Sequence, residues 1–224
     1  MKKNYDKEFL LLKQDWLDNK VKPKLLIHAC CAPCSTYVID QLAKSTDLTI
    51  YFFNPNIHPE EEYLRRAEVT KQFINQYNQN NGTTVNFITT KYEPKQFLKN
   101  VKEMNLANYH EGEERCLMCF EYRLSEVAKY ALNESYDYFG TTLTISPKKN
   151  ANQINQFGLE IAQEHQIKYL VSDFKKREGY LKSIELCKQY GVYRQSYCGC
   201  GFAAVFQNIN FEQIKRDAIK FLNK

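Results

Sequence analysis

The stretch LLIHACCAPCS, residues 25–35, decides the predicted fold. Its first five residues form a short apolar run with a turn signal behind it, which is typical of a buried strand in a parallel sheet. Pro33 stands where a first helical turn would begin, and Tyr37, Val38 and Leu42 continue with helical spacing. We therefore expect a strand, then a tight turn that carries three thiols, then a helix.

Apolar runs and charged amphipathic segments alternate along the rest of the chain. Further strands are expected at 48–56, 84–92, 136–146 and 168–173, and helices at about 58–79 and 151–166, with a mostly helical insertion at about 94–133. This alternation predicts an α/β fold: a mostly parallel sheet with helices on both faces and an added helical segment. No linker rich in Gly, Ser or Pro divides the 224 residues, so we expect one domain with a core at about 25–205 and helical extensions at both ends.

The composition is that of a globular protein from a reducing compartment. The N-terminal FLLL run is too short for a signal-peptide core, and no stretch approaches the ~20 apolar residues of a membrane span, so we expect a cytoplasmic protein with no membrane partner. Eight cysteines then argue against a disulfide framework and for metal binding or redox chemistry. The net charge of +5 permits a polyanionic partner, and no phosphate-binding glycine motif indicates ATP or a dinucleotide.

The first thiol site is the turn itself, with Cys30, Cys31 and Cys34 in five positions. The turn falls at the carboxyl end of a predicted strand, where parallel sheets place their ligand crevice. The dipole and first-turn amides of the following helix would favour thiolate over thiol. The alternative is a turn of small residues with inert buried cysteines.

The second thiol site is the segment RCLMCFEYRL, residues 115–124. Cys116 and Cys119 are three apart and so share one face of a helix, with Arg123 one turn further on. Alone, the pair could be two core cysteines. Together with the first site, two C-x-x-C pairs could bind tetrahedral Zn²⁺ or an Fe–S cluster. A tetrathiolate centre uses four of the five thiols in these two sites. The fifth thiol could hold an additional iron or leave a coordination position open for substrate.

The third thiol site is YRQSYCGCGFA, residues 193–203, in which Cys198 and Cys200 flank Gly199. A C-x-C disulfide closes a small strained ring, so we expect a redox-active pair. The alternatives are two further metal ligands or free thiols in a glycine turn. Cys187 has helical spacing with Ile184 and is expected to be a small buried hydrophobe.

Several residues outside the cysteines are candidates for acid–base or phosphate contacts. His28, Glu113 and Glu114 are candidate proton donors, and His58 and His110 lie in loops that could border the crevice. The hydroxyls of TTLTISPKKN (141–150), with Lys148 and Lys149 opening a helix, suit a phosphate or sugar contact. The basic loop FKKREGYLKS (174–183), with Lys175, Lys176 and Arg177, is a candidate for phosphate-backbone contact. The alternative for His28 is a hydrogen-bonded core histidine, and the other residues could equally be capping residues or solvated surface.

Four segments together resemble one known family. HACCAPCS, RCLMCFEYRL, TTLTISPKKN and REGYLKSIELCKQYGVYRQSYCGCGFA closely resemble the epoxyqueuosine reductase family of the QueH type, over residues 25–205. The resemblance implies a Rossmann-like fold of the nucleotide-hydrolase (HUP-like) kind, a [4Fe–4S] cluster, and an oxidoreductase. It implies reductive removal of the epoxide oxygen from epoxyqueuosine at the tRNA wobble position, the last step of queuosine biosynthesis.

The resemblance also assigns roles to residues. By motif, Cys30, Cys31, Cys116 and Cys119 correspond to the cluster ligands, and Cys198 and Cys200 to a redox-active disulfide. The expected partners are tRNA that carries epoxyqueuosine and a cytosolic electron donor. Phe120 departs from the family pattern, which has tyrosine at this position. The role of Cys34 stays open: it could be a cluster ligand, a ligand of a second metal or a bystander. Two other classes use the same cysteines: a zinc-stabilised RNA-binding module without turnover, and a thiol–disulfide oxidoreductase.

Overall fold

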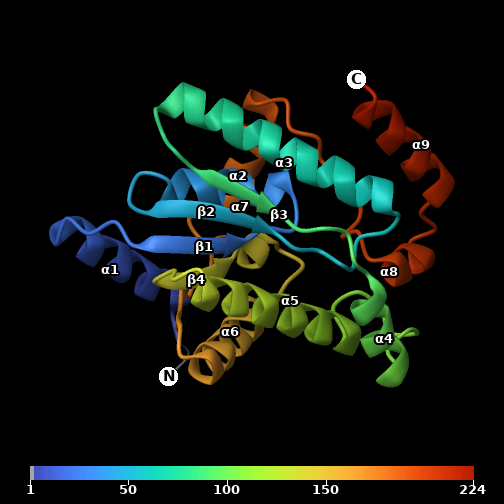
Figure 1. Ribbon diagram of the computed structural model, residues 1–224, viewed down its shortest axis with the longest axis horizontal. Helices are drawn as coiled ribbons and strands as arrows, with labels where there is room; N and C mark the ends of the chain where they lie inside the picture. Colours follow the sequence, from blue (N-terminus) through green and yellow to red (C-terminus); the bar gives the residue numbers. More distant parts are fainter. Residues whose placement is uncertain (1–2) are drawn as a thin grey trace.

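The computed structural model describes residues 3–224 and is built around one five-stranded parallel sheet (Figure 1). The strands are β1 (Lys24–His28), β2 (Asp47–Phe52), β3 (Asn86–Thr89), β4 (Tyr138–Thr141) and β5 (Lys168–Tyr169). Their order is β3-β2-β1-β4-β5, and every neighbouring pair is parallel. The predicted α/β class is confirmed, with β1 at the centre as its uninterrupted apolar sequence indicates.

Helices cover both faces of the sheet. They are α1 (Tyr5–Asp18), α2 (Ala32–Leu42), α3 (Glu60–Asn81), α4 (Lys95–Glu103), α5 (Glu114–Asn133), α6 (Ala151–His165), α7 (Gly179–Gln189), α8 (Gly201–Phe206) and α9 (Phe211–Leu222). Side chains of α1, α2 and α3 pack with Leu25 and Ile27 on one face, whereas those of α5 and α6 pack with Leu26 on the other. Because successive strand residues alternate between faces, both cores meet on β1.

The strand-turn-helix unit of residues 25–35 forms as predicted. β1 ends at His28, and α2 begins at Ala32 with Pro33 in its first turn. Cys31 is the N-cap residue of α2 and has an extended backbone, with φ −174° and ψ 161°. The predicted helix at about 58–79 is α3, which ends at Gly82 in the left-handed conformation, with φ 62°.

Three predicted strands are longer than those observed, because side chains take over their backbone groups or the chain turns away. The strand expected at 136–146 ends at Thr141, whose hydroxyl accepts a hydrogen bond from the Leu143 amide at 3.1 Å and starts a short 3₁₀ helix, Thr142–Ile145. The strand expected at 168–173 ends at Tyr169, and the Asn155 side chain binds both the amide and the carbonyl of Ser172. The strand expected at 84–92 is reduced to β3.

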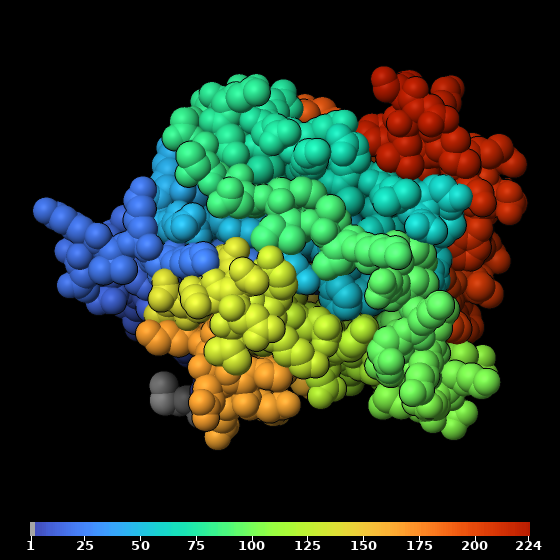
Figure 2. Space-filling view, in the orientation of Figure 1, coloured from blue at the N-terminus to red at the C-terminus, as the bar shows by residue number. Residues whose placement is uncertain are grey.

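The two terminal extensions are helical, as expected. Phe9 and Trp16 of α1 are buried and contact Phe174 and Tyr138, and α9 lies beside α3 (Figure 1). In the space-filling view, α4 and the loop after it (green) and α8 and α9 (red) form the side toward which the strands point (Figure 2). Among residues 3–224, no helix combines the length and the apolar character that crossing a membrane requires.

Candidate active site

A cavity of about 360 Å³ lies at the carboxyl ends of the strands and gathers the thiols of three distant segments. Seven of the eight cysteines line it: Cys30, Cys31, Cys34, Cys116, Cys119, Cys198 and Cys200. The eighth, Cys187, is buried elsewhere, 2% exposed, as predicted. The turn and the helical pair, which the two C-x-x-C spacings suggested could share a metal, thus line one cavity, and the C-x-C segment lines it as well.

The three thiols of the β1–α2 turn have the spacing of ligands to one metal ion. The Cys30 and Cys31 sulfurs are 3.7 Å apart, and all three sulfurs of Cys30, Cys31 and Cys34 lie within 4.8 Å of one another. Two thiolates bound at ~2.3 Å to a tetrahedral ion would be separated by roughly 3.8 Å. This cysteine group could therefore bind a metal, and Cys34 belongs to it rather than lying apart.

Hydrogen bonds among the same three thiols shift their pKa values in opposite directions. Hydrogen bonds from Cys31 and Cys34 lower the pKa of the Cys30 thiol well below its ordinary value. The same interaction with Cys30 raises the pKa of Cys31 to about 12 and raises that of Cys34. Cys30 is thus the thiol of the three that loses its proton most readily, and a metal that binds all three must displace protons.

Lys149 and Arg123 bring positive charge to these thiols. Burial lowers the pKa of Lys149, but the charges of Cys30, Cys34 and Cys198 more than offset this, and the pKa lies above its ordinary value. The helix predicted at 151–166 is α6, which begins at Ala151 with Asn150 as its N-cap, so Lys148 and Lys149 precede this helix and do not open it. Lys149 therefore lies in the loop before α6, where it lines the cavity instead of starting a helix.

The helical pair lies in the first two turns of α5. Burial raises the pKa of both thiols, that of Cys119 to about 12, and the Gly112 amide donates to the Cys116 sulfur at 3.2 Å. Arg115, 1% exposed, holds the preceding loop by donating to the carbonyls of Leu106, Ala107 and Tyr109. Both thiols face the cavity, which is the shared helix face that the spacing predicted.

A chain of hydrogen bonds connects the two C-x-x-C segments. The Asn54 amide donates to the Ala29 carbonyl at 2.8 Å, just before Cys30. Arg123 donates to the Asn54 side-chain oxygen at 3.0 Å and to the Cys119 carbonyl at 3.2 Å. All three groups are buried, so this connection fixes the end of β1 relative to α5.

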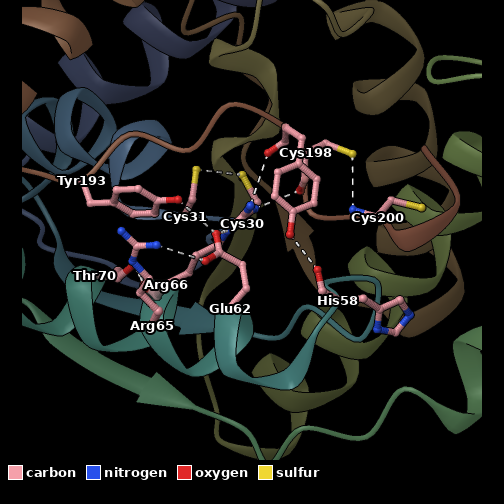
Figure 3. Close-up of polar contacts among 11 residues, drawn as sticks. Cys30, Cys31, His58, Glu62, Arg65, Arg66, Thr70, Tyr193, Cys198 and Cys200 are labelled. Carbon is pink, nitrogen blue, oxygen red and sulfur yellow. Dashed lines mark hydrogen bonds and ion pairs between the residues drawn. The ribbon is translucent and has the colours of Figure 1, made fainter. Parts of the chain in front are cut away.

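The C-x-C segment reaches the cavity from an irregular stretch between α7 and α8. Both thiols are free, and the Cys200 amide points at the Cys198 sulfur, 3.5 Å away (Figure 3). Burial raises the pKa of Cys198 to about 11. Gly199 has φ 102°, in the left-handed region that favours glycine. Its carbonyl accepts from the His58 amide at 2.8 Å.

The histidines and acids expected to donate protons lie outside the cavity lining. His28 is fully buried between the Phe53 carbonyl and the Thr141 hydroxyl, each 3.1 Å from a ring nitrogen, and burial with the charge of Arg123 lowers its pKa to about 3. It is a hydrogen-bonded core histidine that does not line the cavity, which is the alternative to a proton donor. Glu113 and Glu114 are exposed at the N-terminal end of α5.

The other expected polar contacts are rearranged. His58 bonds to Tyr92 and His110 stacks on Phe206, whereas neither lines the cavity. In the basic loop, Arg177 pairs with Asp6 at 3.0 Å and Lys175 donates to the Lys149 carbonyl at 2.8 Å, so part of its charge is already used within the protein. Lys148, Tyr180 and Arg194 line the cavity instead, and Lys148 and Arg194 are exposed.

Three buried polar residues near the site were missed from the sequence: Asn54, Glu62 and Arg66. Asn54 lies in NPN after a strand and was taken as part of a loop. Glu62 and Arg66 are four residues apart in a charged helix, which is the usual pattern of a solvated pair on a helix surface. Nothing local distinguishes such a pair from one covered by a distant segment.

Comparisons with known proteins agree with the geometry. The family model described as Epoxyqueuosine reductase QueH matches residues 25–205. A protein of Staphylococcus epidermidis named Epoxyqueuosine reductase QueH is 50% identical over 221 residues, covering 99% of this chain and 93% of that protein. Proteins with the same name from Streptococcus pyogenes serotype M1 and Thermotoga maritima are 45% and 31% identical, covering 98% and 86% of this chain and 85% and 96% of their own lengths.

Proposed function

The chain belongs to the epoxyqueuosine reductase QueH family, and on that premise we propose that it removes the epoxide oxygen of epoxyqueuosine at the tRNA wobble position, using an iron–sulfur centre. It is an oxidoreductase of queuosine biosynthesis. Conversion of an epoxide to an alkene releases the oxygen as water and consumes two electrons and two protons. The site must therefore supply electrons and protons close to a base of the RNA.

The convergence of seven thiols on one cavity is the observation that carries the proposal. Cys30 and Cys31 from the β1–α2 turn and Cys116 and Cys119 from α5 would hold a [4Fe–4S] cluster. The donor set fits, because four soft thiolates are the ligands that such clusters take. When bound, the cluster would supply electrons one at a time and a Lewis-acidic iron for the epoxide oxygen.

Cys34 would be the ligand of one additional iron. It is the fifth thiol of the two C-x-x-C sites, and its sulfur lies within 4.8 Å of those of Cys30 and Cys31. More than four iron atoms per fully loaded chain would support this part of the proposal. A count of four or fewer would remove it and leave Cys34 as a hydrogen-bond donor to its neighbours.

The remaining lining residues suit a nucleotide substrate. Lys148 and Arg194 would contact phosphates at the rim, and Tyr180 offers an aromatic surface for a base turned out of the RNA. Lys149 keeps its charge beside the thiols and would lower the cost of adding electrons to the cavity. Cys198 and Cys200 would form the redox-active pair that relays electrons from a cytosolic donor.

The test is anaerobic incubation of the purified protein with epoxyqueuosine-containing tRNA and a chemical reductant, followed by mass analysis of the nucleosides. The proposal predicts conversion of epoxyqueuosine to queuosine, with loss of one oxygen, by protein that contains iron and acid-labile sulfide. No conversion by protein that contains zinc and no iron would contradict the proposal and favour an RNA-binding module.

A further inference from the structure

The segment that carries Cys198 and Cys200 is held by a buried ion pair of α3. Arg66 is 2% exposed and Glu62 is fully buried, and the Arg66 Nε atom lies 2.7 Å from a Glu62 carboxylate oxygen. Figure 3 shows both side chains projecting from α3 toward the C-x-C segment. A buried ion pair loses its hydration, so it stabilises a protein only where its other donors are also satisfied.

The other donors of Arg66 are satisfied by the C-x-C segment. One terminal nitrogen donates to the Cys198 carbonyl at 3.1 Å and the other to the Tyr197 carbonyl at 3.3 Å. The planar guanidinium thus binds two successive peptide carbonyls on one side while Glu62 fixes it on the other. These bonds set the orientation of the peptide groups on both sides of the Cys198 α-carbon.

Close packing at Gly199 completes this arrangement. A β-carbon on Gly199 would lie 2.8 Å from an Arg66 nitrogen and 2.8 Å from a side-chain carbon of Ile57. Ile57 also forms an antiparallel bridge with Cys200, the residue after Gly199. The loop is therefore enclosed by Arg66, Ile57 and the chain around them in the conformation in which both thiols are free.

We propose that Arg66, oriented by Glu62, is a positioning residue that stabilises the dithiol form of Cys198 and Cys200 over their disulfide. Oxidation forms one sulfur–sulfur bond and releases two electrons and two protons, the number that deoxygenation of the epoxide consumes. A C-x-C ring brings the sulfurs to bonding distance only if the peptides between them rotate, and rotation breaks the bonds to Arg66. The inference rests on the proposed redox role of this pair.

Stabilisation of the dithiol raises the reduction potential of the pair. The cysteines then stay reduced in contact with the glutathione pool and give up their electrons only when the reaction in the cavity draws them. The hydrogen bonds of Arg66 to the Tyr197 and Cys198 carbonyls also give a reason why the Arg66–Glu62 pair is buried under this loop, where two apolar side chains could pack.

The test is a redox titration of the intact protein, purified anaerobically with its metal. Samples are equilibrated in glutathione buffers of defined potential, alkylated and digested with trypsin. Cleavage after Arg194 and Lys215 gives a peptide, residues 195–215, whose only cysteines are Cys198 and Cys200. Mass analysis of this peptide reports the dithiol and disulfide fractions, undisturbed by the other thiols.

Arg66→Lys is the informative variant, because it keeps the charge for Glu62 but cannot bind both carbonyls. We expect its equilibrium to shift toward the disulfide by about tenfold, which for a two-electron couple lowers the midpoint by about 30 mV. The matched control is Arg65→Lys on the same helix, since Arg65 also faces Glu62, at 3.7 Å, and makes no hydrogen bond to residues 197–200 among those described. Its midpoint should equal that of the unchanged protein.

Each outcome decides a different claim. An unchanged or higher midpoint for Arg66→Lys overturns the inference while leaving the redox pair in place. If Arg66→Lys does not fold, Glu62→Gln takes its place, with a smaller shift expected in the same direction and no shift as the contrary result. If the unchanged protein forms no disulfide at any potential, the proposed redox pair is wrong and the inference falls with it.

Discussion

The two sets of cysteines that face the cavity are held in different ways. Cys30, Cys31 and Cys34 lie at the junction of β1 and α2, and Cys116 and Cys119 lie in α5, so regular hydrogen-bonded elements fix their backbones. Cys198 and Cys200 lie in an irregular stretch, where the peptide groups are bound by side chains of α3 and by the chain around Ile57.

This difference corresponds to the chemistry proposed for each set. Ligands of a cluster must keep their spacing through every redox state, which a strand end and a helix provide. A redox-active pair must change its sulfur–sulfur distance in each cycle, which a helix would resist and a loop allows. The side-chain contacts of the loop then decide which of its two states is favoured.

The largest effect should come from the helical pair. Cys116→Ser with Cys119→Ser removes two ligands on a fixed backbone that nothing nearby can replace. Altered partners of metal ligands alone cost about 10- to 100-fold in affinity, so we expect a larger loss of iron and of turnover than that. Iron per chain and queuosine formation are measured together. Cys187→Ala is the control, because Cys187 is buried outside the cavity and should leave both unchanged.

The second prediction separates the two sets. Cys198→Ser with Cys200→Ser should lower turnover at least about 100-fold, the lower end of the losses expected when a group that takes part in proton transfer is removed. The iron content should stay unchanged, because these residues are not among the proposed ligands. Full turnover would exclude an essential relay. Loss of iron would instead place this pair among the ligands and abolish the distinction drawn above.

The third prediction concerns the connection between the two fixed segments. Arg123→Lys keeps a positive charge but cannot bind Asn54 and the Cys119 carbonyl together, so the segments should be less well aligned. We expect iron to be lost to a chelator about 10-fold faster. Lys129→Ala, an exposed position on the same helix, is the control. An unchanged rate would mean that α5 needs no such connection to hold its ligands.

The smallest effect is expected at Tyr180, which lines the cavity at the start of α7. Tyr180→Ala should weaken tRNA binding about 5-fold, because base stacking on an aromatic is worth at least ~1 kcal/mol. Tyr180→Phe should bind normally, and neither variant should change the iron content. Equal tRNA affinity for the alanine variant, measured at one salt concentration, would mean that the base stacks elsewhere.

The sequence predicted those parts of the molecule whose causes are local. The apolar run before His28, the proline in the first turn of α2 and the three-residue spacing of Cys116 and Cys119 each depend on neighbours in the chain. They therefore predicted the central strand, the helix and the face on which the thiols lie. The position of the Cys30–Cys34 turn at the carboxyl end of a parallel strand predicted that this turn would lie at the ligand crevice.

The features that the sequence did not predict are decided by distant contacts. β5 ends after two residues because Asn155 binds Ser172, and Lys149 faces thiols because its loop folds over the cavity. Arg66 and Glu62 look like a surface pair until residues 131 positions away along the chain cover them. The sequence left His28 open between a proton donor and a core histidine, and its two hydrogen bonds to distant residues decide for the core histidine.

The central claim is that the β1–α2 turn and α5 hold one iron–sulfur cluster between them. The most direct measurement is iron and acid-labile sulfide per chain in anaerobically purified protein, with Cys30→Ser and Cys119→Ser beside it. We predict about four sulfides and at least about four irons per chain, as a [4Fe–4S] cluster requires, and loss of both elements in either variant. One zinc per chain without sulfide, retained in Cys119→Ser, would contradict the account.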